Sequence, residues 1–199
     1  MRKEHFRRKV MKNCSKNYNW SLKCYLIIFI SKGTIIGVKK EVNCMNIQKF
    51  TQKSIEAINN CEKIAYDYGN QEIDQEHFLY SLLTIEDSLI ASLIEKMGID
   101  KDTFIKNIET LLSQKNKVSG NVQLYVSNDL NKVLVNAEDE AKRMGDAYVS
   151  VEHLMLAMIA APNKGIKQLF KTYGINRESF LSALATVRGN QSVTSDNPE

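Results

Sequence analysis

The chain has 199 residues, of which 43% are hydrophobic and 25% charged, with only two prolines and nine glycines. This composition is ordinary for a globular protein, and so little proline and glycine favours long helices. The net charge of +4 divides unevenly: residues 1–44 hold eleven Lys/Arg and two Asp/Glu (+9), whereas residues 45–199 hold sixteen and twenty-one (−5). Since the basic character belongs to the first segment, we expect no nucleic-acid partner for the remainder.

Residues 1–44 form a basic leader that we expect to be disordered or not native. Its apolar run at 25–30 is too short to span a bilayer, and no small-residue cleavage pattern follows it. Attachment to a membrane surface through basic and apolar side chains is the less favoured alternative. Met45 would make a natural start for the folded part.

Helical periodicity begins after the leader. Thr51 is a candidate N-cap for a helix that ends at Gly69, and Asp74, Ser88 and Asp100 are candidate N-caps for three more helices. Behind each cap, apolar residues recur every three or four positions, and no segment shows convincing strand alternation. We therefore predict four helices in this part of the chain.

Residues 114–125 interrupt the pattern, and the same order of signals then returns. Ser127, Ser150 and Asn176 are candidate N-caps, and the turn at Pro162-Asn163 leads into the third helix of this set. The prediction is therefore eight helices in all, four on each side of a linker.

The chain is organised around an internal duplication with an offset of 76 residues. The segment IDQEHFL at 73–79 returns as VSVEHLM at 149–155, and eight further positions recur identically. Two copies of one unit predict a single compact all-α domain with pseudo-twofold symmetry, at residues 45–188. Its parts are repeat one (50–113), the linker (114–125) and repeat two (126–188), and the polar residues 189–199 are expected to form a flexible linker.

Each copy carries a Glu-His pair, Glu76-His77 and Glu152-His153, which raises the question of a metal or acid–base site. Each pair follows an N-cap by two and three positions, where the helix dipole favours Glu and the third residue can join a capping arrangement. No H-E-x-x-H, G-x-S-x-G or metal-type cysteine spacing occurs. We therefore expect structural pairs, with no metal, no cofactor and no catalytic residue.

Other chemistry-bearing residues also fit a core. The Met and aromatic residues follow helical spacing, and Cys61, where the second copy has Ala137, fits a small residue on an apolar helix face. Met side chains can also line an adaptable peptide groove. The seam between the copies is the natural place for a partly apolar groove, and a carboxylate rim there would suit a hydrophobic and basic segment.

This ordered set of features, over residues 45–199, resembles the Clp N-terminal repeat domain. The features that support this resemblance are the capped long helix ending in Gly, the I-D-x-E-H-x-L motif and the second copy of the pattern after a V-S-G linker. The runs KVSG at 117–120, KRMGD at 142–146 and VRGNQSV at 187–193 are most similar to the ClpB family of bacterial disaggregases. The leader has no counterpart in the family.

The resemblance implies a cytoplasmic chaperone domain that captures unfolded or aggregated polypeptide in an apolar groove. Thr51, Asp146 and Glu152 match family surface positions associated with aggregate handling, and we add Leu134 on the seam. Their alternative roles, for the first three, are helix cap, turn residue and first-turn acid. In the family this domain is tethered to two ATPase modules of a hexamer that works with the DnaK system. The chain ends before any ATP-binding loop, so we expect a monomeric, non-enzymatic fragment.

Three alternatives stay open. A ClpC-type domain would dock adaptor proteins and recognise phosphorylated arginine. A metal-dependent enzyme would use the Glu-His pairs. A helix-turn-helix regulator would need a basic recognition face, which the sequence lacks outside the leader.

Overall fold

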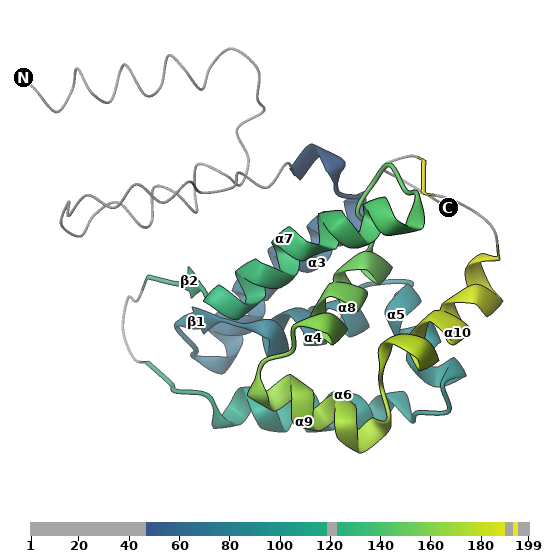
Figure 1. Cartoon of the computed structure of the whole chain (residues 1–199). Coiled ribbons are helices and arrows are strands. Elements are labelled where there is room, and N and C mark those ends of the chain that lie inside the picture. The colour runs from purple at the N-terminus through teal and green to yellow at the C-terminus, as the bar shows by residue number, and fades with distance from the viewer. Residues whose placement is uncertain (1–46, 119–122, 190–192, 195–199) are drawn as a thin grey trace, which may run out of the picture. The chain divides into compact units, whose positions relative to one another are not determined.

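The computed structural model describes residues 47–118, 123–189 and 193–194, and within them the chain forms eight α-helices and two short strands (Figure 1). The helices are α3 (Gln52–Tyr68), α4 (Gln75–Thr84), α5 (Leu89–Lys96), α6 (Lys101–Gln114), α7 (Asn128–Met144), α8 (Val151–Ala160), α9 (Lys164–Tyr173) and α10 (Arg177–Arg188). A 3-10 turn, η1 (Ile47–Lys49), precedes them, and the strands are β1 (Glu72–Ile73) and β2 (Tyr125–Val126). The predicted all-α class with four helices per copy is confirmed. The predicted leader lies outside the described residues.

The helices begin where the sequence predicts, because their caps are local. The candidate N-caps hold the first turns of their helices through side-chain hydrogen bonds, as in Thr51, Ser88, Asp100, Ser127 and Asn176. The long helices α3 and α7 both end in a left-handed glycine, Gly69 (φ 69°) and Gly145 (φ 73°). Local sequence therefore sets both ends of the two longest helices.

The two copies are attached to each other at both ends by equivalent backbone contacts. The Thr51 N–H donates to the Val149 carbonyl at 3.0 Å, and the Ser127 N–H donates to the Ile73 carbonyl at 2.8 Å. Strands β1 and β2 pair in parallel, and a parallel bridge between Phe50 and Val149 repeats this pairing on the other side. The two hydrogen bonds are equivalent under the offset of 76, which relates Thr51 to Ser127 and Val149 to Ile73. The predicted pseudo-twofold relation is thus visible in the backbone.

Helices α4 and α8 lie at the centre, between the α3–α7 pair and the α6–α9 pair (Figure 1). Every residue of α8 from Val151 to Met158 is buried, and α4 is buried along most of its length. A helix that is apolar nearly all round belongs inside a protein. Over the described part of the chain, no single helix is long and apolar enough to cross a membrane, whereas the bent pair α4 and α5 meets these two criteria together.

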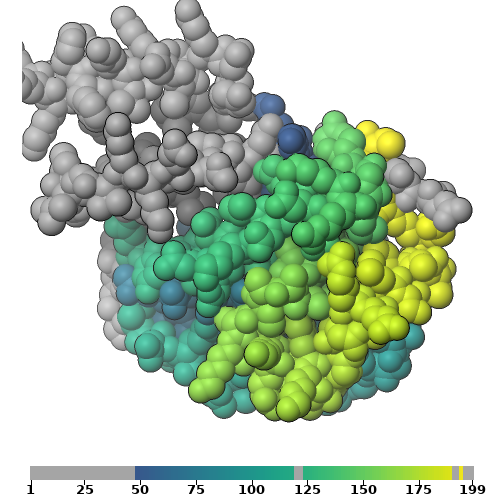
Figure 2. Space-filling view, viewed as in Figure 1, coloured from purple at the N-terminus to yellow at the C-terminus, as the bar shows by residue number. Residues whose placement is uncertain are grey.

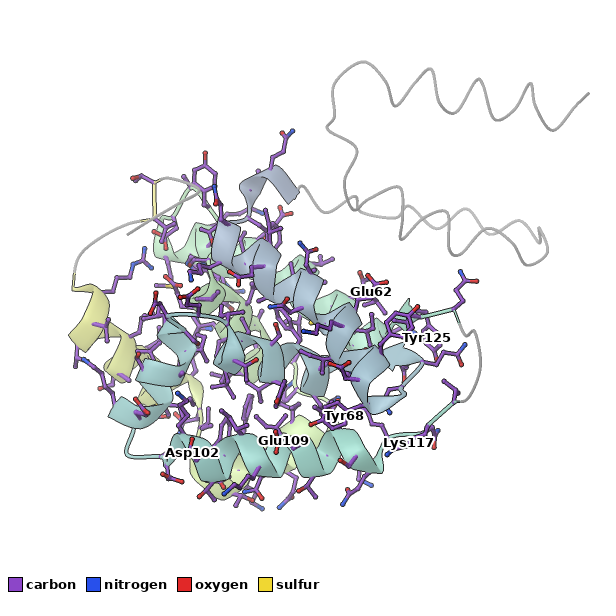
Figure 3. The ribbon with its side chains drawn as sticks, turned by 180° about the vertical axis from the view of Figure 1, so that it is seen from behind. Glu62, Tyr68, Asp102, Glu109, Lys117 and Tyr125 are labelled. Atoms are coloured by element: carbon purple, nitrogen blue, oxygen red, sulfur yellow. The ribbon has the colours of Figure 1, made fainter. Side chains whose placement is uncertain are left out.

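Aromatic contacts connect the outer helices to this centre. The rings of Tyr68 (α3) and Tyr80 (α4) meet edge to face with centroids 6.3 Å apart, and the Tyr80 hydroxyl donates to Glu109 of α6 at 3.2 Å (Figure 3). Cys61 is buried and its counterpart Ala137 is fully buried, so the small-core-residue interpretation is confirmed. Burial raises the pKa of the Cys61 thiol, which makes it a poor nucleophile.

Candidate functional site

The first Glu-His pair lies in a polar cluster at the start of α4, which we call the first-copy cluster (Asn70, Asp74, Glu76, His77 and Lys115). The Asp74 N–H donates to His77 Nδ1 at 3.0 Å, and His77 Nε2 lies 3.1 Å from Asn70 Oδ1. Because Nδ1 accepts the bond from the backbone, the ring proton lies on Nε2 and is donated to Asn70. His77 therefore completes a capping box, as the sequence predicts.

The carboxylates of the first-copy cluster are neutralised from two directions. The Lys115 ammonium lies 2.8 Å from both Asp74 and Glu76, and the Asn163 amide, from the other copy, donates to Glu76 at 3.0 Å and to Asp74 at 3.2 Å. Burial raises the pKa of Asp74, but hydrogen bonds from Lys115, Ser127 and the Gln75 N–H outweigh it and leave that pKa below its usual range. Both carboxylates are engaged within the protein.

The second pair lies in the equivalent second-copy cluster (Asp146, Ser150, Glu152, His153 and Arg188). The Ser150 N–H donates to His153 Nδ1 at 3.0 Å, and His153 Nε2–H donates to Asp146 Oδ2 at 2.8 Å. Arg188 donates to Asp146 Oδ1, and its Nη1 lies 3.6 Å from Glu152 Oε1. Burial raises the pKa of Asp146, but the bonds from Arg188 and from a backbone N–H prevail and lower it.

Both imidazoles are held neutral. Burial lowers the pKa of His77 to about 4, and burial also lowers the pKa of His153. Each ring makes a hydrogen bond through both nitrogens, so neither ring has a nitrogen free to ligate a metal or move a proton. Across the segments that the structure describes, no group of three His, Cys, Asp or Glu side chains is placed to hold a metal ion. The structural role expected for the Glu-His pairs is confirmed.

The four residues expected to bind substrate are all buried, with exposed fractions of 2% for Thr51, 7% for Leu134, 9% for Asp146 and 3% for Glu152. Three of them meet at one end of the domain, because the Thr51 N–H donates to Val149, which lies between Asp146 and Glu152 in the chain. The structural roles of cap, turn residue and first-turn acid are present there. Direct contact of these four side chains with a polypeptide stays a prediction.

Val193 differs from the flexible linker expected at 189–199. It is buried, its N–H donates to Asp146 Oδ1 at 2.8 Å, and its carbonyl accepts from the Ala147 N–H at 3.0 Å. The offset of 76 relates Val193 to Lys117, which bridges Asn70 in the first copy. The internal duplication could have predicted this contact, because the equivalence of the two copies continues past the last helix of each. The boundary at 188 and the linker on either side of Val193 stay predictions.

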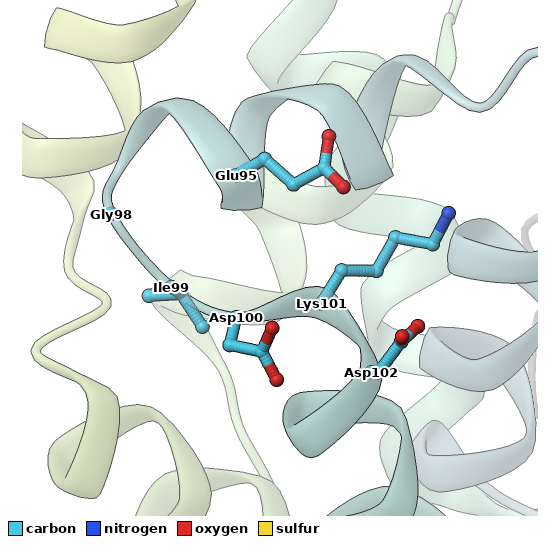
Figure 4. Close-up of a pocket in the computed structure, with 6 residues that line it drawn as sticks. All are labelled: Glu95, Gly98, Ile99, Asp100, Lys101 and Asp102. Atoms are coloured by element: carbon cyan, nitrogen blue, oxygen red, sulfur yellow. The ribbon is translucent and has the colours of Figure 1, made fainter.

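Two hollows open on the outer surface. The smaller, about 410 Å³, lies at the turn between α5 and α6, where Glu95, Lys101 and Asp102 extend beside the turn (Figure 4). Asp100 lines the same hollow, but its carboxylate is occupied as the cap of Thr103, and these hydrogen bonds lower its pKa. The polar groups of this hollow therefore belong to the turn that caps α6, with charged side chains around it.

The larger hollow, about 720 Å³, lies on the seam between α6 of the first copy and α9 of the second. Helix α9 crosses the lower part of the face shown in Figure 2. The sequence predicts a partly apolar groove on the seam between the copies, where a carboxylate rim would suit a hydrophobic and basic segment. The rim instead carries three lysines, Lys164, Lys167 and Lys171, while Leu111 and Leu169 supply apolar surface.

The sequence also matches known proteins. Residues 49–173 match the Clp repeat (R) N-terminal domain. The chain is 38% identical over 160 residues to the chaperone protein ClpB of Bacillus anthracis and 39% identical over 160 residues to that of Nitratidesulfovibrio vulgaris. These matches cover 78% of this chain but only 18% of each relative.

The fold also resembles those of solved structures, including two N-terminal domains. The N-terminal domain of Hsp104 from Candida albicans aligns with a TM-score of 0.63 at 22% identity, covering 74% of this chain and 97% of that one. The N-domain of ClpV from Vibrio cholerae aligns with a TM-score of 0.61 at 19% identity, covering 83% of this chain and 99% of that one.

Proposed function

Because this chain belongs to the family of Clp repeat N-terminal domains, which are not themselves catalytic, we propose that it is the polypeptide-binding accessory domain of a ClpB-type disaggregase. The family match is the observation that carries this proposal. The chain spans about a fifth of the length of its curated relatives, at 18% of each. ATP-driven disaggregation, assembly into a hexamer and cooperation with the DnaK system are therefore proposed for a longer protein that contains this domain.

The geometry supports binding as the role of the domain. The Glu-His pairs, which are the groups best suited to chemistry, are buried and hydrogen-bonded in both copies. The two hollows described above lie on the outside of the helices. Such a surface suits weak, reversible capture, which raises the local concentration of a substrate near a tethered partner.

Capture of unfolded chains is proposed at the end of the domain where Thr51, Asp146 and Glu152 lie. Since these side chains are buried, their part is to hold the turn at 145–150 in place rather than to supply area. Within that turn Ala147 is exposed, and Tyr148 and the nearby Met144 are partly exposed, which provides apolar surface for an unfolded segment. Leu134 is buried farther along α7, ten residues before Met144, and is not one of the residues that meet at this end.

The proposal is tested by an NMR titration of the whole chain with a reduced and alkylated polypeptide that cannot fold. We expect amide shifts at Thr51 and across 144–152, weakening when the same polypeptide is offered in its folded, disulfide-bonded form. No shifts at millimolar polypeptide would overturn the proposal.

Docking of a defined partner, as in a ClpC-type adaptor domain, is the second candidate. A solved complex of a ClpV N-domain with a VipB peptide, at TM-score 0.59 and 18% identity, holds a specific peptide on the same fold. If this role is the main one, the chain binds one peptide sequence and its scrambled version does not compete. An unfolded-chain receptor would instead bind both versions comparably.

A further inference from the structure

The third helix of each copy lies beside the fourth helix of the other copy. This gives two junctions, α5–α10 and α6–α9, and they differ. Helices α5 and α10 pack against each other with Ala91 and Ala183 buried. The offset of 76 relates Ala91 to Lys167 of α9 and Ala183 to Asn107 of α6, and both of these residues are exposed. The contacts of Tyr173 in α9 with Phe104 and Asn107 in α6 show that these two helices are also neighbours. The first junction thus has buried alanines at these positions, whereas the second has exposed polar residues and the groove of about 720 Å³.

The open junction has a distinct charge. Lys164, Lys167 and Lys171 follow one side of α9 and are exposed, and no carboxylate lines the groove. Within the described part of the chain, none of these three ammonium groups lies within 4.0 Å of a carboxylate. Residues 45–199 carry a net charge of −5, counted as sixteen Lys/Arg against twenty-one Asp/Glu. The groove is therefore a local positive strip on an otherwise acidic part of the chain.

The groove also offers apolar surface next to this strip. Leu111 of α6 and Leu169 and Tyr173 of α9 line it, and Asn107 donates a hydrogen bond across it to the Tyr173 hydroxyl. The Phe104 ring packs edge to face against Tyr173 with centroids 4.9 Å apart, which fixes the aromatic ring from below. The floor of the groove is thus partly apolar, with cations along one side.

We propose that the groove between α6 and α9 binds an extended, acidic polypeptide segment in which carboxylates alternate with apolar side chains. Along α9 the first and last lysines are about 10 Å apart, since each helical residue advances about 1.5 Å. Alternate side chains of an extended chain are about 6.6 Å apart and share one face. Two or three successive carboxylates can therefore face the lysines while the intervening side chains face the floor.

Charge decides the occupant. A basic segment would be repelled by the three lysines, which excludes the chain's own residues 1–44 with their net charge of +9. The site is separate from the end of the domain proposed for unfolded chains, where Thr51 and Glu152 lie, so the two proposals fail independently. Because the lysines are exposed, binding here is weak and sensitive to salt.

The test measures binding of a fluorescent peptide with alternating Glu and Leu to the whole chain by anisotropy at low salt. The variant K164E/K167E/K171E reverses the strip, and the control K63E/K96E/K142E makes the same change in net charge at exposed lysines of α3, α5 and α7. We expect the groove variant to lose at least about tenfold in affinity and the control to keep most of it. Added salt weakens binding to the unmodified chain.

Three results would overturn the proposal. Equal losses in the two variants would show a response to net charge alone, and binding unchanged by the groove variant would assign the peptide to residues 1–44. A peptide with Lys in place of Glu that binds as tightly would refute the charge preference. NMR shifts with the unmodified chain serve as a second measurement. Shifts at Leu111 and Leu169 support the groove, whereas shifts confined to 144–152 reject it while leaving the proposed function intact.

Discussion

The two copies bury the same Glu-His motif but neutralise it with different groups. In the first-copy cluster the imidazole donates to the neutral Asn70, and Lys115 and the Asn163 of the other copy serve the carboxylates. In the second-copy cluster the imidazole donates to the charged Asp146, which also holds Arg188. The shared part is the backbone cap, and the variable part is the supply of charge. The two copies thus keep the same local geometry of the cap, but different side chains neutralise the buried carboxylates in each.

The largest effect is expected in the core, from Phe104→Ala and Phe180→Ala. Both rings are fully buried, so each truncation should lower the free energy of unfolding by about 3–5 kcal/mol. Phe104 also packs on Tyr173 of the other copy, so its loss should exceed that of Phe180 by about 1 kcal/mol. Urea unfolding followed by circular dichroism measures both values. A double-mutant cycle with Tyr173→Leu isolates the ring contact, and a coupling energy near zero would contradict it.

The next effect separates the two clusters. Arg188→Met leaves Asp146 and Glu152 buried without their cation, and should cost about 3 kcal/mol. Lys115→Met should cost less, about 1–2 kcal/mol, because Asn163 still donates to the carboxylates of the first-copy cluster. The same urea measurement compares the two variants. Equal losses would mean that Asn163 gives the first copy no real compensation.

Acid should weaken the fold through the buried imidazoles. The pKa of His77 is about 4 in the folded chain against 6.5 for an unperturbed histidine, so the unfolded chain binds more protons between these values. The free energy of unfolding should therefore fall as pH drops from about 7 to 4, by about 3 kcal/mol from His77. The lowered pKa values of Asp74 and Asp146 add losses at lower pH, in the same direction.

Unfolding curves across this pH range, with His77→Gln and His153→Gln as matched variants, measure the contribution of each copy. Each substitution should flatten the pH dependence, because the proton-binding difference between the folded and unfolded chain is removed. A variant with an unchanged slope would show that its imidazole titrates alike in both states.

The smallest effect concerns two equivalent caps. Ser127 Oγ accepts from the Leu130 N–H at 3.0 Å and donates to Asp74 at 2.6 Å, whereas Thr51 Oγ1 accepts from the Ser54 N–H at 3.4 Å. Ser127→Ala should therefore cost about 1–2 kcal/mol and Thr51→Ala about 0.5–1 kcal/mol. Thermal unfolding of the two variants ranks them. The reverse order would show that the contact with Asp74 adds nothing.

Much of the fold was predictable because its determinants are local. An N-cap acts within three residues and a left-handed glycine within one turn, so Thr51, Ser127, Gly69 and Gly145 are recognisable in the sequence itself. The capping role of His77 and His153 follows from their position behind Asp74 and Ser150 for the same reason. The duplication added the pseudo-twofold relation, since equal segments fold alike.

By itself, the sequence determined the all-α class, the eight helices, their N-caps, the glycine ends of α3 and α7, and the structural use of the Glu-His pairs. Only the tertiary structure decided that Lys115 and Arg188 neutralise the two clusters, that Val193 is held on Asp146, and that Lys164, Lys167 and Lys171 border an open groove. These features join residues far apart in the chain, through side chains whose partners depend on how the copies pack. Helical periodicity and capping carry no information about such partners, because they act within a few residues, whereas burial and charge pairing act across the assembled domain.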